Sequence, residues 1–180
     1  MAIHELIISV SSRTQSSSAI SMVLNANGKW QNVKASLEKY IDDNLVIAEG
    51  LIVDFEDFPF EGTGQAEWVE ERILGPGRRD YHRQISSTAI GQTTEIVLNF
   101  NIFVNPNKTT KTNRHYEIRD LIASCFKIGT QIDLYDFSNN DWITSLQKME
   151  VRDIITDRTI PDPDFLMYSF TVIIAWLEQW

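Results

Sequence analysis

The chain has 180 residues, of which 43% are hydrophobic and 23% charged, and its 16 Lys and Arg against 25 Asp and Glu give a formal net charge of −9. This composition is typical of one globular domain and excludes a disordered or fibrous protein. The negative charge disfavours a protein that wraps nucleic acid, and the single cysteine excludes an intramolecular disulfide and a cysteine-based zinc site.

Residues 1–29 are expected to form an N-terminal arm. A short strand is expected over residues 3–10, and a polar linker follows that includes the run Ser16-Ser17-Ser18. The most apolar stretch, residues 165–177, is shorter than the ~20 residues that a membrane span needs, and no basic segment precedes the apolar start of the chain. We therefore expect no membrane association and a protein that stays in the cytoplasm where it is made.

The first helix is expected over residues 30–43, with Asn44 as its end. Its apolar side chains recur with the period of an amphipathic helix and are Trp30, Val33, Leu37, Tyr40 and Ile41. The period then changes. Apolar residues alternate with more polar ones over residues 51–56, which predicts a strand with one wetter face.

Two further strands are expected before the second helix. The first covers residues 67–74 and ends at the turn Gly75-Pro-Gly77. The second covers residues 94–104, where six residues share one face and Glu95, Asn99 and Asn101 share the other. A one-residue slip would bury those polar side chains, so the register of this strand is well specified.

A polar loop over residues 105–113 ends in Asn113, a good N-cap for a helix from Arg114 to about Lys127. Three strands are expected to follow, over residues 131–137, 146–155 and 165–177, with a turn at Pro161-Asp-Pro163-Asp between the last two. The last strand is apolar on both faces, which predicts a central strand covered on both sides.

The predicted order is therefore arm-α-β-β-β-α-β-β-β, with residues 30–180 as a single domain. Two helices against one antiparallel-rich mixed sheet define an α+β fold.

No motif in the sequence carries catalytic chemistry. His4, His82 and His115 are spread over separate elements without metal-ligand spacing, and Cys125 is expected on the buried face of its helix. We predict no catalytic residue, no metal site and no cofactor. Acidic residues at Asp54-Phe-Glu56-Asp57 leave open a small enzyme or ligand-binding module, although solvated acids at a strand end are the more ordinary interpretation.

Two basic segments stand out in this acidic chain. Arg and Tyr side chains on loops favour protein interfaces, because they offer bidentate donors and rigid contact area. The alternative is a solvated loop that keeps the turn soluble. The candidate interface residues are Arg78, Arg79, Tyr81, His82, Arg83, Lys108, Lys111 and Arg114.

The order of elements resembles that of the phage tail terminator (tail-completion) family. The resemblance covers about residues 30–178, and the 29-residue arm lies outside it. The segments that carry the resemblance are the helix 33–41, the strand Trp68-Val69-Glu70, the run 114–122, the strand 132–137 and the closing strand 168–176.

The resemblance implies a structural virion protein without enzymatic activity. It implies a homohexameric ring that caps the tail tube, ends its polymerisation and presents the surface for joining the head. The implied partners are further copies of the chain, the tail tube protein and a head-completion or connector protein, with DNA passing through without sequence-specific binding. The implied location is the virion tail or neck, and the host cytoplasm during assembly. Another phage neck or tail-tube component, or a monomeric interaction adaptor, remains an alternative.

Replacing both Arg78 and Arg79 with Glu is expected to leave the fold intact, because both residues follow a turn, and to weaken subunit association. Sedimentation velocity of the double variant beside the unmodified chain, at low and high salt, measures the effect. Unchanged association at both salt concentrations would contradict an interface role for these arginines.

Overall fold

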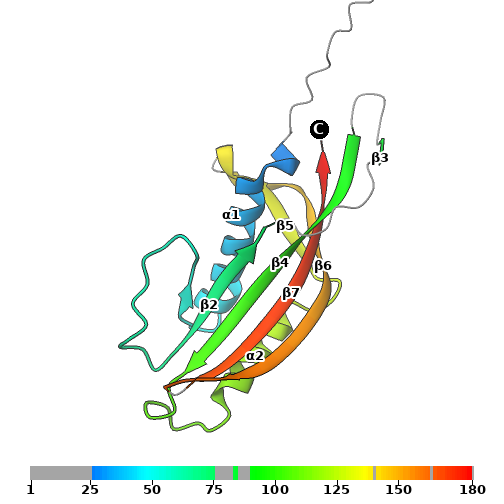
Figure 1. The fold of residues 1–180 in the computed structure, drawn as a ribbon. Coiled ribbons are helices and arrows are strands. Elements are labelled where there is room, and N and C mark those ends of the chain that lie inside the picture. The colour runs from blue at the N-terminus through cyan, green and yellow to red at the C-terminus, as the bar shows by residue number, and fades with distance from the viewer. Residues whose placement is uncertain (1–25, 76–82, 85–89, 140, 163, 180) are drawn as a thin grey trace, which may run out of the picture.

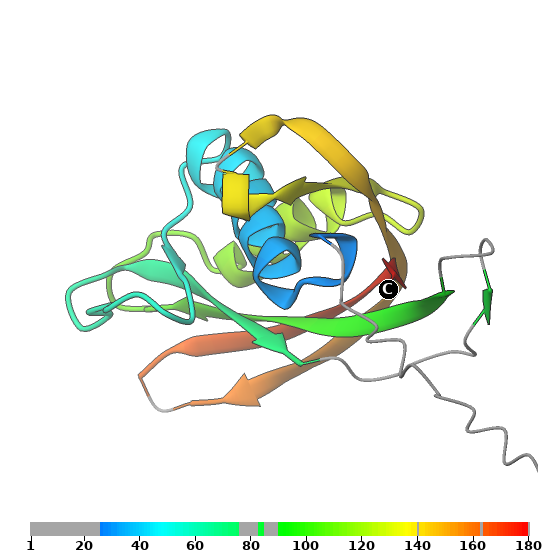
Figure 2. The same cartoon turned by 90° about the horizontal axis from the view of Figure 1, so that it is seen from above.

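The structure, a computed structural model, describes residues 26–75, 83–84, 90–139, 141–162 and 164–179. Two helices pack on one face of a curled sheet (Figures 1 and 2). The elements are α1 (Trp30–Ile41), β1 (Val53–Asp54), β2 (Glu67–Leu74), β3 (Arg83–Gln84), β4 (Ile90–Val104), α2 (Arg114–Cys125), β5 (Gln131–Asp136), β6 (Asp141–Pro161) and β7 (Leu166–Gln179).

The sheet is mixed, with the strand order β1-β2-β4-β7-β6-β5, and β3 pairs with β4 beside this path. Only β1 and β2 run parallel, and every other pair is antiparallel. The predicted α+β fold with an antiparallel-rich mixed sheet and two helices is confirmed. The two-residue β3 is one strand more than the predicted order contained.

The core lies between the helices and the inner face of β4 and β7. Ile96, Leu98 and Phe100 of β4 are fully buried, and Phe100 pairs with Phe170 of β7. The ring of Phe126, at the end of α2, lies 5.3 Å from that of Phe100. The predicted alternation along this strand is confirmed, since its apolar face meets the helices and its asparagines lie on the other face.

Helix α1 is buried through two kinds of contact. Val33, Leu37 and Ile41 are fully buried apolar residues, as the helical period predicts. Asn32 and Ser36 are buried as well, because their side-chain oxygens accept hydrogen bonds from the backbone N–H groups of Phe137 (3.0 Å) and Tyr135 (2.9 Å). The sheet curls so that β5 reaches the side of α1 opposite β4 (Figure 2).

Several predicted boundaries are wrong. The first helix does not stop at Asn44, because a π-helical turn, Asp42–Ile47, continues it with Leu45 fully buried, and Gly50 (φ +68°) follows. The expected strand over residues 51–56 shrinks to Val53–Asp54, the only residues in register with β2. Strands β4 and β6 begin before the predicted residues, and β6 also ends after them.

The last strand, β7, is central, between β4 and β6, as predicted. In the described part of the chain helices cover one of its faces (Figure 2), and a layer over the second face stays a prediction. On that second face Asn99 donates from Nδ2 to the hydroxyl oxygens of Ser169 (3.2 Å) and Thr171 (3.0 Å). Both hydroxyl residues are buried, and these hydrogen bonds satisfy their polar groups.

Cys125, expected on the buried face of the second helix, is half-buried and packs against the core, and burial raises the pKa of its thiol. Over the described residues, no helix is long and apolar enough to cross a membrane.

Phe170→Ala is expected to lower the free energy of unfolding by about 3–5 kcal/mol, because the fully buried ring leaves a cavity between β7, β4 and α2. Phe137→Ala, at a position that is 47% exposed, is the matched control and should cost less than about 1 kcal/mol. Urea unfolding of both variants measures the difference. Equal losses would contradict the central position of β7 in the core.

Candidate functional site

One edge of the sheet is open along the second half of β6. Strand β5 pairs with β6 only between Asp141 and Glu150. The backbone of Val151 then bonds to Gly129 and Thr130. Beyond this point β6 pairs with β7 on one side, and no strand in the described part of the chain pairs with residues 152–161 on the other. Figure 1 shows this half of β6, in orange, along the outer border of the sheet.

At the opposite edge, two short stretches have no partner strand among the described residues. Strand β1 pairs only with Val69 and Glu70, so residues 71–74 of β2 extend beyond it. Strand β2 reaches β4 only as far as Val97, and β3 pairs only with Ile90 and Gly91. Residues 92–96 of β4 therefore have no partner strand on that side among the described residues. The open edges of β6 and of β2 with β4 lie on opposite sides of one sheet (Figure 1).

The open half of β6 begins at an irregularity. The register shifts between Val151 and Asp153, and the carboxylate of Asp153 accepts a hydrogen bond of 2.8 Å from the backbone N–H of Ile154. Ile155 follows and is 45% exposed. Bulges and acidic side chains are the usual means by which proteins restrain a free strand edge. The backbone of this edge can therefore pair with a further strand, except where the carboxylate of Asp153 already accepts the N–H of Ile154.

Three loops meet at the far end of the sheet, around residues 57–66, 105–113 and 162–165. Arg114, the first residue of α2, donates to both carboxylate oxygens of Glu67 at 2.7–3.1 Å and to Glu117 at 3.1 Å. The hydrogen bonds that Arg114 donates to Glu67 raise the pKa of Arg114 above its ordinary value. Lys108 donates from Nζ to the carbonyl oxygens of Thr63 (3.3 Å) and Gly64 (3.2 Å).

The structure places four of the predicted basic interface residues. Lys108 and Arg114 tie the loops to one another, and Lys111 pairs with Glu117 at 3.1 Å while its side chain stays 60% exposed. Arg83 opens β3, where its backbone is in register with Gly91. Arg78, Arg79, Tyr81 and His82 lie outside the described residues. Contact of these eight residues with a partner stays a prediction.

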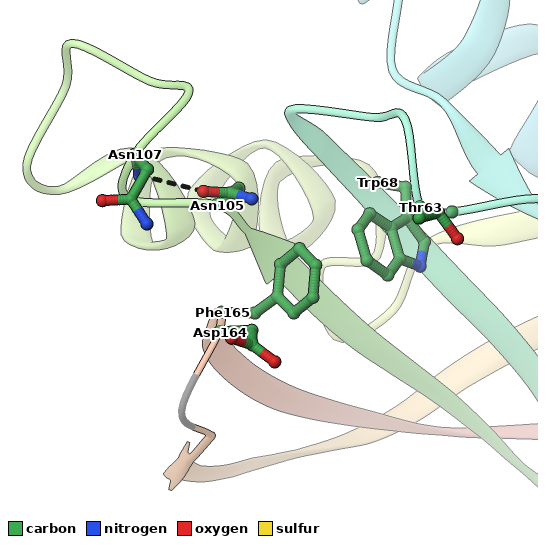
Figure 3. A pocket seen from close by; sticks show the side chains of 7 residues that line it. Thr63, Trp68, Asn105, Asn107, Asp164 and Phe165 are labelled. Carbon is green, nitrogen blue, oxygen red and sulfur yellow. Dashed lines mark hydrogen bonds between the residues drawn. The ribbon is translucent and has the colours of Figure 1, made fainter.

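A hollow of about 500 Å³ opens between the three loops (Figure 3). The ring of Trp68 lies 4.9 Å from that of Phe165 at an interplanar angle of 79°, and it stacks on Phe103 at 4.7 Å. A side chain at Gly62 would come within 3.2 Å of the Trp68 ring, so glycine lets the loop lie against it. The lining residues are Gly62, Thr63, Trp68, Asn105, Asn107, Asp164 and Phe165.

The sequence did not point to this hollow. Trp68 and Phe165 are far apart in the chain and meet because β2, β4 and β7 are neighbours in the sheet. The strand register is the signal that would have indicated it. Trp68 pairs with Phe103, and Phe103 pairs with Met167, which lies two residues after Phe165.

The acidic residues proposed for an enzyme do not converge on a shared site. The buried Asp54 pairs with Arg72 at 2.9 Å, whereas Glu56 and Asp57 pair with Lys34 of α1. Within the described ranges no group of three or more His, Cys, Asp or Glu side chains could hold a metal ion.

Glu71 is the unusual carboxylate of the molecule. It pairs with Phe100 across the sheet on the inner, helix-covered face, is fully buried, and among the described residues neither carboxylate oxygen has a hydrogen-bond partner at standard geometry. Burial, with smaller contributions from the charges of Glu38 and Glu56, raises its pKa to about 7, and the charge of Lys34 and the nearby backbone N–H of Glu56 oppose the rise. The core therefore favours the protonated acid.

No protein-family model and no curated protein sequence matches this chain. Among solved structures 11 chains match the fold. One, whose name states no function, shares 9% sequence identity over 84% of this chain and 96% of its own, with a TM-score of 0.56. At that identity the likeness supports the fold and nothing about activity.

Glu71→Gln is expected to remove a pH dependence of stability. Because the pKa of Glu71 is about 7 when folded and near 4.5 when unfolded, the folded chain holds the proton more tightly. Its free energy of unfolding should fall by up to about 3 kcal/mol as the pH rises from 4.5 to 7. The glutamine variant should lose this fall. Urea unfolding at pH 5 and pH 8 measures it, with the exposed Glu49→Gln as control. An unchanged fall in Glu71→Gln would contradict the assignment.

Proposed function

We propose that this chain is a ring-forming structural protein of a phage virion, a tail terminator that caps the tail tube, ends its polymerisation and presents the head-joining surface. The observation that carries the proposal is that, among the described residues, stretches without a partner strand lie at two different edges of one sheet. The resemblance in element order supports it independently.

Two different edges favour a head-to-tail contact. If residues 152–161 of one copy pair with the open edge of β2 and β4 on the next, each copy uses one edge as donor and the other as acceptor. Such a heterologous contact closes into a ring when the rotation per copy divides the full turn, and grows without limit when it does not. The curl of the sheet supplies a rotation at every contact, which favours closure (Figure 2).

The charge of the chain supports the same role. A net charge of −9 repels phosphate, so DNA passing through a ring of such subunits is not retained. The exposed Lys111 is then available for contacts with acidic surfaces of the tube or of a head-completion protein.

Asp54, Glu56 and Asp57 each pair with a cation of the same chain, which favours the structural role over the enzyme alternative. Light scattering of the purified chain over a range of concentrations separates the remaining classes. A discrete species near six times 20.7 kDa is expected for a terminator. A species that grows with concentration indicates a tube component, and a monomer that does not bind a tail tube contradicts the proposal.

Ile154→Pro tests the edge directly. Ile154 donates its N–H to Asp153, so proline removes a donor at the open edge, and rings should no longer form. Ile154→Ala is the matched control: it loses the same side-chain packing but keeps the N–H, and should still assemble. Circular dichroism checks that both variants fold, and light scattering reads their mass. Rings from a folded Ile154→Pro variant would contradict pairing along this stretch of β6.

A further inference from the structure

The hollow at the loop end of the sheet has two aromatic walls. The rings of Trp68 and Phe165 pack edge to face, at 79° with centroids 4.9 Å apart, and both line the hollow (Figure 3). Behind them Phe103 stacks on Trp68 at 4.7 Å, and Phe60 lies 6.0 Å from Trp68. The walls are therefore fixed by packing within this chain before any ligand arrives.

A carboxylate lies beside these two aromatic rings. Asp164 lines the hollow, is exposed, and its side chain has no hydrogen-bond or ion-pair partner among the described residues. Its own backbone N–H donates to Asp162 at 2.9 Å, which holds the turn. Glu61 adds a further exposed acid next to Gly62. The ammonium group of Lys108 on the neighbouring loop is engaged by the carbonyl oxygens of Thr63 and Gly64.

The remaining lining groups can complete hydrogen bonds to a donor-rich ligand. Asn105 and Asn107 lie on the loop after β4, and the side-chain oxygen of Asn105 accepts the backbone N–H of Asn107 at 2.9 Å. Asn107 and Thr63 are exposed and line the hollow, and the Thr63 hydroxyl donates to the carboxylate of Glu61, which leaves its oxygen as an acceptor. Amide and hydroxyl oxygens accept hydrogen bonds from N–H groups, as a carboxylate does.

We infer that this hollow binds an organic cation, the guanidinium or ammonium group of a basic side chain on a protein partner. Aromatic faces attract a cation through the ring quadrupole, and a neighbouring carboxylate adds a charge-assisted hydrogen bond. A phosphate or carboxylate ligand would be repelled by Asp164, and a purely apolar ligand would desolvate that carboxylate without compensation. A volume of about 500 Å³ accommodates one long side chain with its flanking peptide. The inference does not depend on ring formation.

The probe is the capped tripeptide acetyl-Gly-Arg-Gly-amide, and the matched control is the same peptide with citrulline, which has the shape of arginine without its charge. The chain has five tryptophans, so their indole N–H signals are few in an NMR spectrum, and Trp68→Phe assigns the signal of Trp68. The arginine peptide should shift this signal in a saturable way. The citrulline peptide should bind about tenfold more weakly, since it lacks the cation–π and charge contributions.

Asp164→Asn keeps the size of the side chain and removes its charge, and should weaken binding of the arginine peptide several-fold. Glu49→Gln removes an exposed acid from the end of the π-helical turn and should leave binding unchanged. Equal affinities for the arginine and citrulline peptides, unchanged affinity in Asp164→Asn, a response to methyl glucoside but not to the arginine peptide, or no saturable shift of the Trp68 signal would each overturn the inference.

Discussion

The pairing of β4 with β7 is the contact on which the rest of the molecule depends. It runs without interruption from Gly91 and Gln179 to Val104 and Leu166, and its inner face carries the buried side chains that receive both helices. The partners are more than 60 residues apart in the chain, so this ladder closes the longest loops within the sheet. Strand β2 pairs with the free side of β4, and β6 pairs with the free side of β7. The loops around the ends of these four strands are thereby brought together.

Features that show in neighbouring residues of the sequence could be predicted, whereas features that depend on the order of the strands could not. The alternation along residues 94–104 fixed the strand and its faces, since each residue reports its own environment. The length of β6 was not visible, because its second half alternates poorly beside an irregular register. The burial of Glu71 was not visible either, since no sequence rule places an acid opposite Phe100. The aromatic corner of Trp68 and Phe165 needed the strand order, which a single sequence does not contain.

The two proposed surfaces occupy different parts of the sheet. The open edge of β6 lies along its side, whereas the hollow lies at its end, where loops rather than strands determine the chemistry. A subunit built this way can contact its neighbours through backbone groups, which are indifferent to sequence, and meet a different protein through side chains, which are selective. The salt bridge of Arg114 with Glu67 fixes the start of α2 to the strand that carries Trp68.

The hydrogen bonds that Asn32 and Ser36 of α1 accept have a consequence for growth of the sheet. The backbone N–H of Tyr135 in β5 and that of Phe137, just after β5, are bonded to the helix and cannot be donated to an incoming strand. At these two positions helix α1 therefore blocks extension of the sheet past β5, in addition to its role in the core.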